Sequence, residues 1–239
     1  MTREEAARRA LPLVDLTSLN EDDTPERIAA LCEQAVTPKG NVAAVCVYAP
    51  FVRQCVEALR GTGVRVATVA NFPAGGMDVA AVRAEIEAEL ADGADEIDVV
   101  LPYRVYAEGD REGALEMIHA AREVTGRTTL KVILETGSLE TPELIRAAGS
   151  DALAAGADFL KTSTGKLQPG ATLEAAQPML EVIRAAGRGG FKASGGVRTA
   201  EDAGRYLELA DEEFGPEWAT PRTFRFGASS LLGDLLAAL

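Results

Sequence analysis

The sequence predicts an α/β protein that folds as one (β/α)₈ barrel over residues 1–239. Eight short apolar runs typical of strands recur along the chain, and stretches rich in Ala, Glu and Arg alternate with them. The runs are nearly continuous in Val, Ile, Ala and Leu, which is typical of parallel strands covered on both faces. The length of 239 residues is also close to that of such a barrel, about 250 residues. A doubly wound sheet, in which about six strands are usual, is the alternative.

The expected elements follow one another along the chain. Strands are expected over 11–19, 41–49, 64–72, 96–102, 129–136, 158–164, 190–195 and 223–228. Amphipathic helices are expected between them, and 77–93 and 141–157 show the pattern clearly. Helix start signals are Thr24-Pro25, Asp78 and Thr141-Pro142, and stop signals are Gly93 and Gly156. One loop-like insertion, 212–222, precedes the last strand, and no stretch has the composition of a linker between domains.

The net charge excludes several partners. The chain has 24 Lys and Arg against 37 Asp and Glu, a formal net charge of −13. Nucleic acid and anionic membrane surfaces both attract basic proteins, so neither is expected to be the main partner.

No apolar stretch is long enough to span a membrane. The first ten residues, MTREEAARRA, lack the apolar core of a signal peptide, so we expect the protein in the cytoplasm.

Cysteine and histidine are scarce. The three cysteines, Cys32, Cys46 and Cys55, and the single histidine, His119, are too few for a disulfide framework or a zinc site. One histidine on an expected helix also argues against a His-based catalytic triad. We therefore expect neither a bound metal nor a cofactor. Cys46 lies among small apolar residues, which is the usual setting of a buried thiol.

Lysine is also rare, with five lysines against nineteen arginines. Lys131, Lys161 and Lys192 lie in or directly after the fifth, sixth and seventh expected strands, and Lys166 closely follows the sixth. Arginine cannot lose its proton near neutral pH, whereas a buried lysine can, so an amine nucleophile has to be a lysine. In a barrel of this class, polar residues at the carboxyl ends of strands are candidates for the active site.

Lys161 is the leading candidate nucleophile. It follows Phe159 and Leu160, so its ammonium is expected at the edge of the core, where desolvation lowers the pKa of an amine. Lys192, on the neighbouring strand at a similar height, would add a second positive charge and lower that pKa further. A neutral amine can attack a carbonyl and form a Schiff base, as in a metal-free aldolase. The competing interpretation is a lysine whose stem follows the barrel rim and whose ammonium reaches water.

Acidic side chains are expected beside these lysines. Asp98 alternates with Glu96 and Val100, so one face of the fourth strand carries carboxylates. Asp98 would either move protons to and from the Schiff-base carbon or hold the lysines in an ion-pair network. Asp15, in the first strand, has the same two interpretations, and Thr17 is equally consistent with an ordinary strand threonine.

Glycine, serine and lysine follow the last three strands. They are Gly165 and Lys166 after the sixth strand, Gly195 and Gly196 after the seventh, and Ser229 and Ser230 after the eighth. Adjacent glycines let backbone N–H groups approach an anion, and the N-terminus of a helix adds a favourable dipole. The loops after the seventh and eighth strands are the usual phosphate site of this barrel class. The ligand is therefore expected to be a small phosphorylated metabolite.

Several segments resemble the deoxyribose-phosphate aldolase family. They are VDLTSLNEDDT, GADEIDVVLPY, GADFLKTSTGK, FKASGGVRTAEDA and RFGASSLL, and the resemblance extends from about residue 11 to residue 236. It implies a TIM barrel that reversibly cleaves 2-deoxy-D-ribose 5-phosphate into D-glyceraldehyde 3-phosphate and acetaldehyde by a class I mechanism. It also implies a cytoplasmic enzyme of deoxynucleoside breakdown that works without a metal. In the branch that this sequence resembles, the enzyme is often a homodimer.

The resemblance implies roles for individual residues. Lys161 matches the Schiff-base lysine, Lys192 matches a second lysine that tunes it, and Asp98 matches the acid that works with Lys192 in proton transfer. Contacts to the substrate or its phosphate are implied for Thr164, Gly165, Lys166, Gly195, Gly196, Ser229 and Ser230, and positions lining the pocket for Asp15, Thr17 and Cys46. Relatives in that branch often carry a tail that ends in tyrosine. This sequence ends at Leu239, so no role of such a tail is carried over.

Two other functions are consistent with the pattern. A different lysine-dependent lyase, such as an aldolase for another sugar phosphate, would use the same barrel, and a panel of substrates would distinguish it. A phosphometabolite-binding protein without catalysis would bind phosphate ligands and form no covalent adduct. The presence of both lysines and Asp98 argues against the binding protein, which needs neither an amine of low pKa nor a buried acid.

Overall fold

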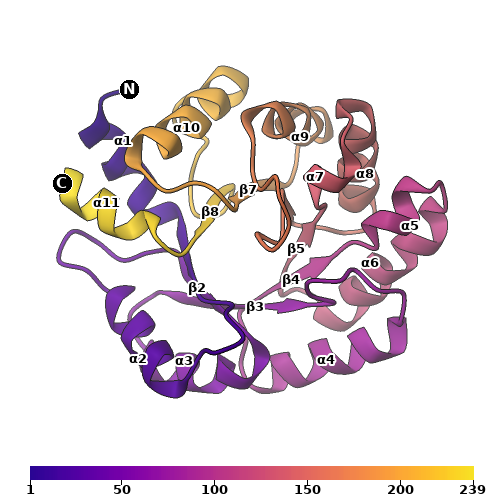
Figure 1. Cartoon of the computed structure of the whole chain (residues 1–239), viewed down its shortest axis with the longest axis horizontal. Helices are drawn as coiled ribbons and strands as arrows, with labels where there is room; N and C mark the ends of the chain where they lie inside the picture. Colours follow the sequence, from indigo (N-terminus) through magenta and orange to yellow (C-terminus); the bar gives the residue numbers. More distant parts are fainter.

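Eight parallel strands close into a barrel in the computed structural model, which describes residues 1–239 (Figure 1). The strands are β1 (Val14–Thr17), β2 (Ala44–Val47), β3 (Arg65–Ala70), β4 (Glu96–Val100), β5 (Thr129–Ile133), β6 (Phe159–Lys161), β7 (Gly190–Ser194) and β8 (Phe224–Ala228). Each strand pairs with the next, and β8 pairs with β1. The predicted barrel is therefore confirmed. The doubly wound sheet is excluded, because such a sheet has two open edges.

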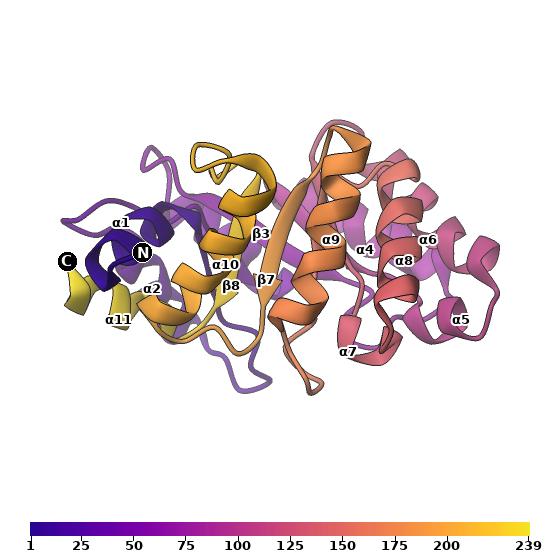
Figure 2. The same cartoon turned by 90° about the horizontal axis from the view of Figure 1, so that it is seen from above.

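Helices surround the barrel and connect successive strands (Figures 1 and 2). They are α1 (Arg3–Ala10), α2 (Pro25–Gln34), α3 (Val52–Ala58), α4 (Val79–Ala91), α5 (Tyr103–Ala107), α6 (Arg111–Thr125), α7 (Thr136–Leu139), α8 (Pro142–Ala154), α9 (Leu173–Ala186), α10 (Ala200–Phe214) and α11 (Leu231–Ala238), with 3₁₀ helices η1 (Leu11–Leu13) and η2 (Ala49–Phe51). Helix α1 packs against α10 and α11, so the two termini lie on the same side of the molecule. None of these helices has the length and apolar character that crossing a membrane requires.

Capping geometry confirms the expected helix boundaries. The hydroxyls of Thr24 and Thr141 and the carboxylate of Asp78 each accept a hydrogen bond from a backbone N–H in the first turn of α2, α8 and α4. Gly93 and Gly156 follow the ends of α4 and α8 with φ angles of 99° and 110°. Backbone in this region favours glycine, which explains why these two helices end where they do.

Several boundaries differ from the sequence prediction. The runs expected as strands over 41–49, 129–136 and 158–164 leave the sheet at Val47, Ile133 and Lys161. The run expected over 11–19 forms the 3₁₀ helix η1 first and joins the barrel only at Val14. Helix α10 extends into the expected insertion 212–222 and ends at Phe214. The ring of Phe214 stacks on Trp218 with the ring centroids 4.0 Å apart, and this contact holds the last turn of the helix against the loop that follows.

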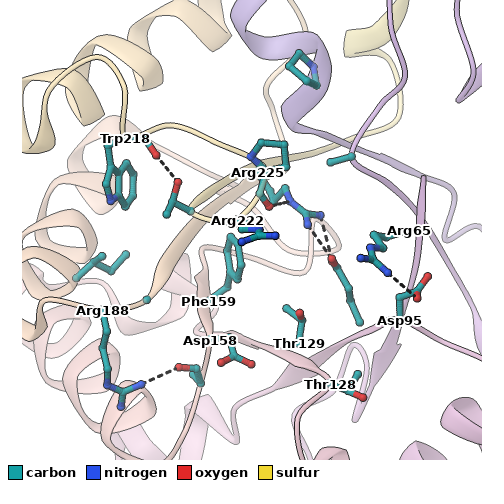
Figure 3. A pocket seen from close by; sticks show the side chains of 18 of the residues that line it. Arg65, Asp95, Thr128, Thr129, Asp158, Phe159, Arg188, Trp218, Arg222 and Arg225 are labelled. Carbon is teal, nitrogen blue, oxygen red and sulfur yellow. Dashed lines mark hydrogen bonds and ion pairs between the residues drawn. The ribbon is translucent and has the colours of Figure 1, made fainter. Parts of the chain in front are cut away.

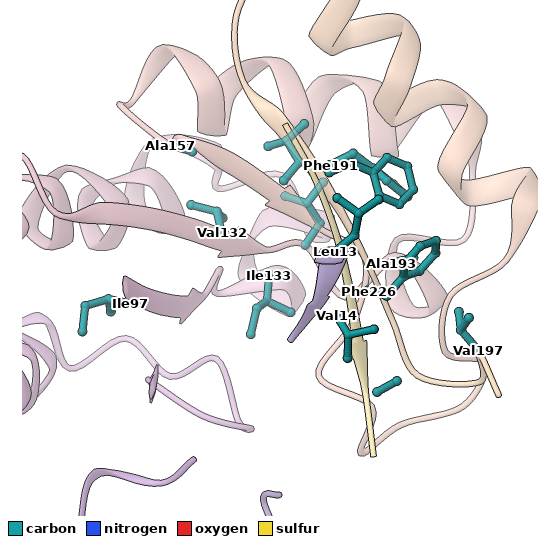
Figure 4. Close-up of a cluster of buried hydrophobic side chains, with 14 of the residues drawn as sticks. Leu13, Val14, Ile97, Val132, Ile133, Ala157, Phe191, Ala193, Val197 and Phe226 are labelled. Carbon is teal, nitrogen blue, oxygen red and sulfur yellow. The ribbon is translucent and has the colours of Figure 1, made fainter. Parts of the chain in front are cut away.

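Apolar side chains fill the layer between the barrel and the helices (Figure 4). Ile97, Val132 and Phe191 lie there, each one residue away from a charged residue of the same strand. Phe191 packs against Phe224, and Phe224 against Phe226, with ring centroids 5.3 and 4.9 Å apart. Successive side chains of a strand point to opposite faces. The charged neighbours of these apolar residues therefore point into the barrel.

Candidate active site

Seven charged side chains form a cluster inside the barrel. They are Asp15 from β1, Glu96 and Asp98 from β4, Lys131 from β5, Lys161 from β6, Lys192 from β7 and Arg225 from β8. None is more than 4% exposed. Charges removed from water are stable only when they are paired and hydrogen-bonded, so the partners of each group decide its state of charge.

Asp98 lies at the centre of the cluster and accepts hydrogen bonds from three lysines. Its Oδ1 is 2.6 Å from Nζ of Lys131, and its Oδ2 is 2.8 Å from Nζ of both Lys161 and Lys192. Strand register produces this arrangement, because Asp98 pairs with Lys131 across β4 and β5, and Lys161 pairs with Lys192 across β6 and β7. The two lysines and the acid that the sequence analysis selected are therefore in direct contact.

Lys161 has fewer ion-pair partners than the other two lysines. Asp98 is its only carboxylate partner, whereas Lys192 also contacts Asp15 at 2.5 Å and Lys131 also contacts Glu96 at 2.7 Å. Burial lowers the pKa of Lys161, and the positive charge of Lys192 adds to this effect, so that together they outweigh Asp98. The pKa of Lys161 therefore lies below the ordinary value, which favours the neutral amine.

The neighbours of Lys161 remain charged. Burial lowers the pKa of Lys192 and of Lys131, but their carboxylate partners outweigh burial, and the pKa of each lysine is raised. Burial raises the pKa of Asp98, but the three lysines around it hold that pKa well below its ordinary value. Lys161, whose amine has a lowered pKa, thus lies next to the ammonium of Lys192 and the carboxylate of Asp98. This combination can supply a nucleophile, a proton donor and a proton acceptor.

Arg225 and Glu96 complete the cluster. Nη1 of Arg225 is 2.6 Å from Oδ1 of Asp15, and Nη2 is 2.7 Å from Oε1 of Glu96. Sequence reasoning placed Glu96 on the face of Asp98 but gave Arg225 no role. The signal for Arg225 is its position between Phe224 and Phe226, because alternation along a strand puts it on the opposite face from those two rings. Neither residue contacts Lys161.

Asp15 and Thr17, both on β1, have different environments. Asp15 is fully buried, and Lys192 and Arg225 hold its pKa below the ordinary value although burial opposes them. Thr17 is half-buried, and its hydroxyl donates to the backbone carbonyl of Asp15 at 2.8 Å. Asp15 is thus a member of the ion-pair network, while the hydroxyl of Thr17 is engaged within its own strand.

Cys46 belongs to a small apolar cluster on the first three strands. The cluster consists of Leu19, Cys46, Ala67 and Val69, with Tyr48 and Phe72 packed against it. Burial raises the pKa of the Cys46 thiol, and the charges of Lys192 and Lys161 act on it in the opposite direction. A cavity of about 450 Å³ is lined by Tyr48, Val69 and Phe72. Cys46 is therefore a buried thiol within electrostatic range of both lysines.

The glycines and serines expected to bind phosphate lie in three neighbouring loops, because β6, β7 and β8 are adjacent in the barrel. Gly165 and Gly195 approach so closely that a Cβ on Gly195 would be 3.2 Å from Cα of Gly165. Both residues have positive φ angles, as does Gly196. Ser229 and Ser230 are exposed before α11, and their hydroxyls form no hydrogen bond within the protein. Backbone and hydroxyl donors of these loops are thus available to a ligand.

Thr164 and Lys166 have contacts that the sequence analysis did not identify. The hydroxyl and the backbone N–H of Thr164 both donate to Oε2 of Glu135, at 2.6 and 3.2 Å. Glu135 is fully buried at the end of β5, has a φ angle of 54°, and its Oε1 has no partner. Nζ of Lys166 donates to the carbonyl of Leu19, in the loop after β1. The loop after β6 is therefore tied to Glu135, which follows the neighbouring strand β5, and to the loop after β1, which is not adjacent to it in the barrel.

Histidine and cysteine are not members of the charged cluster. His119 is exposed on α6, where the sequence analysis expected a helix. The three cysteines are buried and form no disulfide. No group of three or more His, Cys, Asp or Glu side chains is arranged so that it could hold a metal ion.

Known proteins share both the sequence pattern and the fold. A family model described as DeoC/LacD family aldolase matches residues 9–236. A structure from Coccidioides immitis, assigned as a deoxyribose-phosphate aldolase, is 31% identical with a TM-score of 0.84, and the match covers 96% of this chain and 85% of that chain. An apo structure from Toxoplasma gondii with the same assignment is 28% identical with a TM-score of 0.90, covering 99% and 97%. Deoxyribose phosphate aldolase from Aeropyrum pernix, described as a tetramer, shares the fold at 24% identity and a TM-score of 0.77, covering 99% and 92%.

Proposed function

The chain belongs to the DeoC/LacD family of aldolases, and we propose that it reversibly cleaves 2-deoxy-D-ribose 5-phosphate into D-glyceraldehyde 3-phosphate and acetaldehyde through a Schiff base on Lys161. The observation that carries this proposal is a buried lysine with one carboxylate partner and a lowered pKa. A class I aldolase needs such an amine. The relatives at 31% and 28% identity that are assigned as deoxyribose-phosphate aldolases support the choice of sugar.

The proposed reaction proceeds through an enamine. The neutral amine of Lys161 attacks C1 of the open-chain aldehyde, and water leaves as the protonated imine forms. The C3 hydroxyl then loses its proton, the C2–C3 bond breaks, and its electrons form the enamine while D-glyceraldehyde 3-phosphate departs. Protonation at C2 restores the imine, and water releases acetaldehyde and the free amine. The protonated imine accepts the electrons of the breaking bond, which lowers the barrier to cleavage.

Lys192 and Asp98, together with water, would move the protons. Lys192 is held as an ammonium and can donate, whereas Asp98 is held as a carboxylate and can accept. At the enamine stage the nitrogen of Lys161 is neutral, so Asp98 loses one of the three positive charges that lower its pKa. Asp98 is thus a stronger base at the stage that follows removal of the proton from the C3 hydroxyl, so Asp98 holds that proton more firmly.

The phosphate of the substrate would bind at the loops after β6, β7 and β8. Backbone N–H groups beside glycines and the start of a helix are well suited to an anion. The proposed phosphate ligands are Gly165, Lys166, Gly195, Gly196, Ser229 and Ser230. The sugar end would lie against Asp15, Thr17, Cys46 and Thr164.

The proposal extends to the biological setting. Deoxyribose phosphates arise when deoxynucleosides are broken down, so the enzyme would act in that catabolism, in the cytoplasm, on a small phosphorylated sugar. It would act as a homodimer. Size-exclusion chromatography with light scattering separates a dimer from a monomer and from a tetramer, the assembly described for the Aeropyrum pernix protein.

Trapping of the Schiff base tests the mechanism. The protein is incubated with acetaldehyde, reduced with borohydride, digested and mapped by mass spectrometry. An ethyl group is expected on Lys161. The Lys161→Met variant should form no adduct and lose cleavage activity, while Lys39→Met, which changes an exposed lysine outside the barrel, should behave as the wild type. An adduct on another lysine, or substantial cleavage by folded Lys161→Met, would contradict the mechanism.

A panel of phosphorylated sugars tests the substrate separately. The panel contains 2-deoxyribose 5-phosphate and ketose mono- and bisphosphates, and the products are identified by mass spectrometry. Acetaldehyde release from the deoxysugar is expected to be the fastest reaction. Cleavage of a ketose phosphate at a higher kcat/KM would reject the proposed substrate while leaving an aldolase.

A further inference from the structure

The largest cavity lies at the end of the barrel opposite to the proposed phosphate loops. Its volume is about 1220 Å³, and residues at or just before the amino ends of β2 to β8 line it (Figure 3). Lys161 and the loops after β6, β7 and β8 do not contribute to its wall, and two members of the charged cluster, Glu96 and Arg225, do. Neither of these two contacts Lys161. The cavity is therefore a separate feature that the proposed aldol chemistry does not use.

Arginine dominates the ionic groups of this cavity. The arginines in its wall are Arg65, Arg127, Arg184, Arg188, Arg222 and Arg225, and the carboxylates are Asp95, Glu96 and Asp158. Six positive groups against three negative ones leave an excess of three positive charges, in a chain whose net charge is −13. This cavity is thus a locally positive region of an acidic protein, which favours the binding of an anion there.

Each carboxylate of the wall already has a partner, and Arg184 pairs with Glu213, outside the wall, at 2.8 Å. Asp95 pairs with Arg65 at 3.3 Å, and Glu96 pairs with Arg225 at 2.7 Å. Asp158 pairs with Arg122, outside the wall, at 3.1 Å. These ion pairs occupy the carboxylates of the wall, so none of the three carboxylates is left to pair with the remaining arginines.

Three arginines of the wall have no carboxylate partner. Arg188 donates only to the backbone carbonyls of Leu153 and Ala157. The guanidinium groups of Arg127 and Arg222 form no hydrogen bond or ion pair within the protein. A guanidinium presents a planar fork of donors that matches phosphate oxygens. Two free forks, Arg127 and Arg222, and the positive charge of Arg188 around one cavity fit a ligand with several phosphate oxygens.

Aromatic rings line another part of the same wall. Trp218, the only tryptophan of the chain, stacks on Phe214, and both rings belong to the wall. The guanidinium of Arg225 lies over the ring of Phe159, 5.7 Å from its centroid. Ion pairs of Arg225 to Asp15 and Glu96 hold it in place in the wall. The wall therefore contains packed aromatic rings and a paired arginine as well as arginines that have no carboxylate partner.

We propose that this cavity is a second ligand site, which binds a compact oligophosphate, either a free polyphosphate or the phosphate chain of a nucleotide. The cavity, at about 1220 Å³, is somewhat larger than most small-molecule sites, which leaves room for an extended phosphate chain, and the acidic surface of the remaining chain opposes a long polyanion such as nucleic acid. The site is independent of the proposed aldol reaction.

Fluorescence of Trp218 provides a direct test. Wild-type protein at low ionic strength is titrated with tripolyphosphate while the emission of its single tryptophan is followed, and ATP and AMP are titrated by calorimetry. Tripolyphosphate is expected to bind with a Kd below about 1 mM, and AMP, with fewer phosphate oxygens, more weakly. Equal affinity for ATP and tripolyphosphate would assign binding to phosphates alone, and tighter binding of ATP would add contact of the base with the aromatic wall; both results support the proposal.

Matched variants locate the site. Arg127→Gln/Arg222→Gln removes two unpaired guanidinium groups and should weaken tripolyphosphate at least about tenfold. Arg60→Gln/Arg205→Gln changes the net charge equally at exposed residues outside the cavity and should leave the affinity within about twofold. Both variants are checked for folding by circular dichroism.

Three results would overturn the proposal. One is the absence of binding to folded wild-type protein at millimolar tripolyphosphate. Another is equal loss of affinity in the two double variants, which would indicate general charge attraction. The third is loss of binding in Lys166→Ala, which would place the anion at the proposed substrate loops. The titration is repeated with Lys161→Met, so its result does not depend on aldolase activity.

Discussion

At the scale of single residues, the number of carboxylate partners separates two lysines that otherwise have similar surroundings. Lys161 and Lys192 pair across adjacent strands, both are buried, and both contact Oδ2 of Asp98. Lys192 has Asp15 as a second partner, and its pKa is raised, whereas the pKa of Lys161 is lowered. One additional carboxylate thus decides which amine is available as a nucleophile.

Removal of the Asp98 carboxylate should separate adduct formation from turnover. In Asp98→Asn, Lys161 loses its only carboxylate partner, so its pKa should fall further and acetaldehyde adducts should form at lower pH than in the wild type. Turnover should fall about 10²- to 10⁴-fold because a proton acceptor is lost. The measurements are the pH profile of borohydride trapping and kcat for cleavage.

The control for Asp98→Asn is Glu96→Gln, which removes a carboxylate of the same cluster that does not contact Lys161. Each variant should lose about 3–5 kcal/mol of unfolding free energy, because a buried cation loses a partner. Only Asp98→Asn should move the trapping profile. A pH profile of borohydride trapping that moves to higher pH in Asp98→Asn would contradict this explanation of the Lys161 pKa.

Gly227 is required where two side chains of β7 approach β8. A Cβ at this position would lie 2.1 Å from Oγ of Ser194 and 3.0 Å from Cε of Lys192. Gly227→Ala should therefore displace Lys192 and reduce kcat by about 10²-fold. Gly233→Ala, where a Cβ meets nothing within 4 Å on α11, should retain activity and slightly stabilise the helix. A wild-type kcat in folded Gly227→Ala would contradict the prediction, because it would show that displacement of Lys192 does not affect the reaction.

At the scale of elements, most helices begin at a side-chain cap and bury an apolar face, but α4 also buries a carboxyl group. Glu89 is 1% exposed, accepts a hydrogen bond from Thr68 of β3 at 3.3 Å, and leaves Oε2 without a partner. Burial, with a smaller contribution from Glu85, raises the pKa of Glu89 to about 8. The contact between α4 and the barrel is therefore sensitive to pH.

Glu89→Gln should remove a pH dependence of stability. The unfolded chain releases this proton near pH 4.5, while the folded chain retains it up to about pH 8. In this window the folded state binds more protons, so the free energy of unfolding falls as pH rises, by at most about 1.4 kcal/mol per pH unit.

Urea unfolding of wild type and Glu89→Gln at several pH values between 5 and 8 measures the difference. The variant should gain stability over the wild type as pH increases. Glu87→Gln, an exposed neighbour on the same helix, is the control and should follow the wild type. A constant difference across this range would contradict a raised pKa for Glu89.

At the scale of the whole molecule, negative charge dominates the surface while the barrel interior is balanced by ion pairs. The net charge is −13, yet the interior cluster holds four cations and three carboxylates. The pKa values of Asp15, Glu96 and Asp98 are all lowered, because each of the three faces lysine or arginine at close range. The cluster therefore depends on carboxylates that must remain ionised.

Acid should unfold the protein steeply below pH 4. The unfolded chain takes up protons on these aspartates near pH 3.8, whereas the folded chain resists protonation until lower pH. Stability present above this pH is lost as pH falls, at about 1.4 kcal/mol per pH unit for each such group. Urea unfolding between pH 6 and 3 measures the slope. Glu4→Gln, at an exposed ion pair, should keep the wild-type slope, and a flat profile would contradict this account of the cluster.

Much of the fold was predictable, because its signals are local. The eight apolar runs, the capping residues Thr24, Asp78 and Thr141, and the glycines that end two helices all act within a few residues of their own position. The exact entry of the first strand and the end of α10 were not predictable. Those boundaries depend on contacts such as that between Phe214 and Trp218.

The sequence by itself determined the barrel, the scarcity of lysine and the presence of lysines and acids on neighbouring strands. Only the tertiary structure decided which amine has a lowered pKa and which arginines line the cavity at the amino ends of the strands. Lys192 and Asp15 are 177 residues apart in the chain, and Arg225 and Asp15 are 210 apart. Strand alternation and strand order select the candidates, but the pKa of a buried group depends on distances of a few ångströms to partners from other strands, which only closure of the barrel brings together.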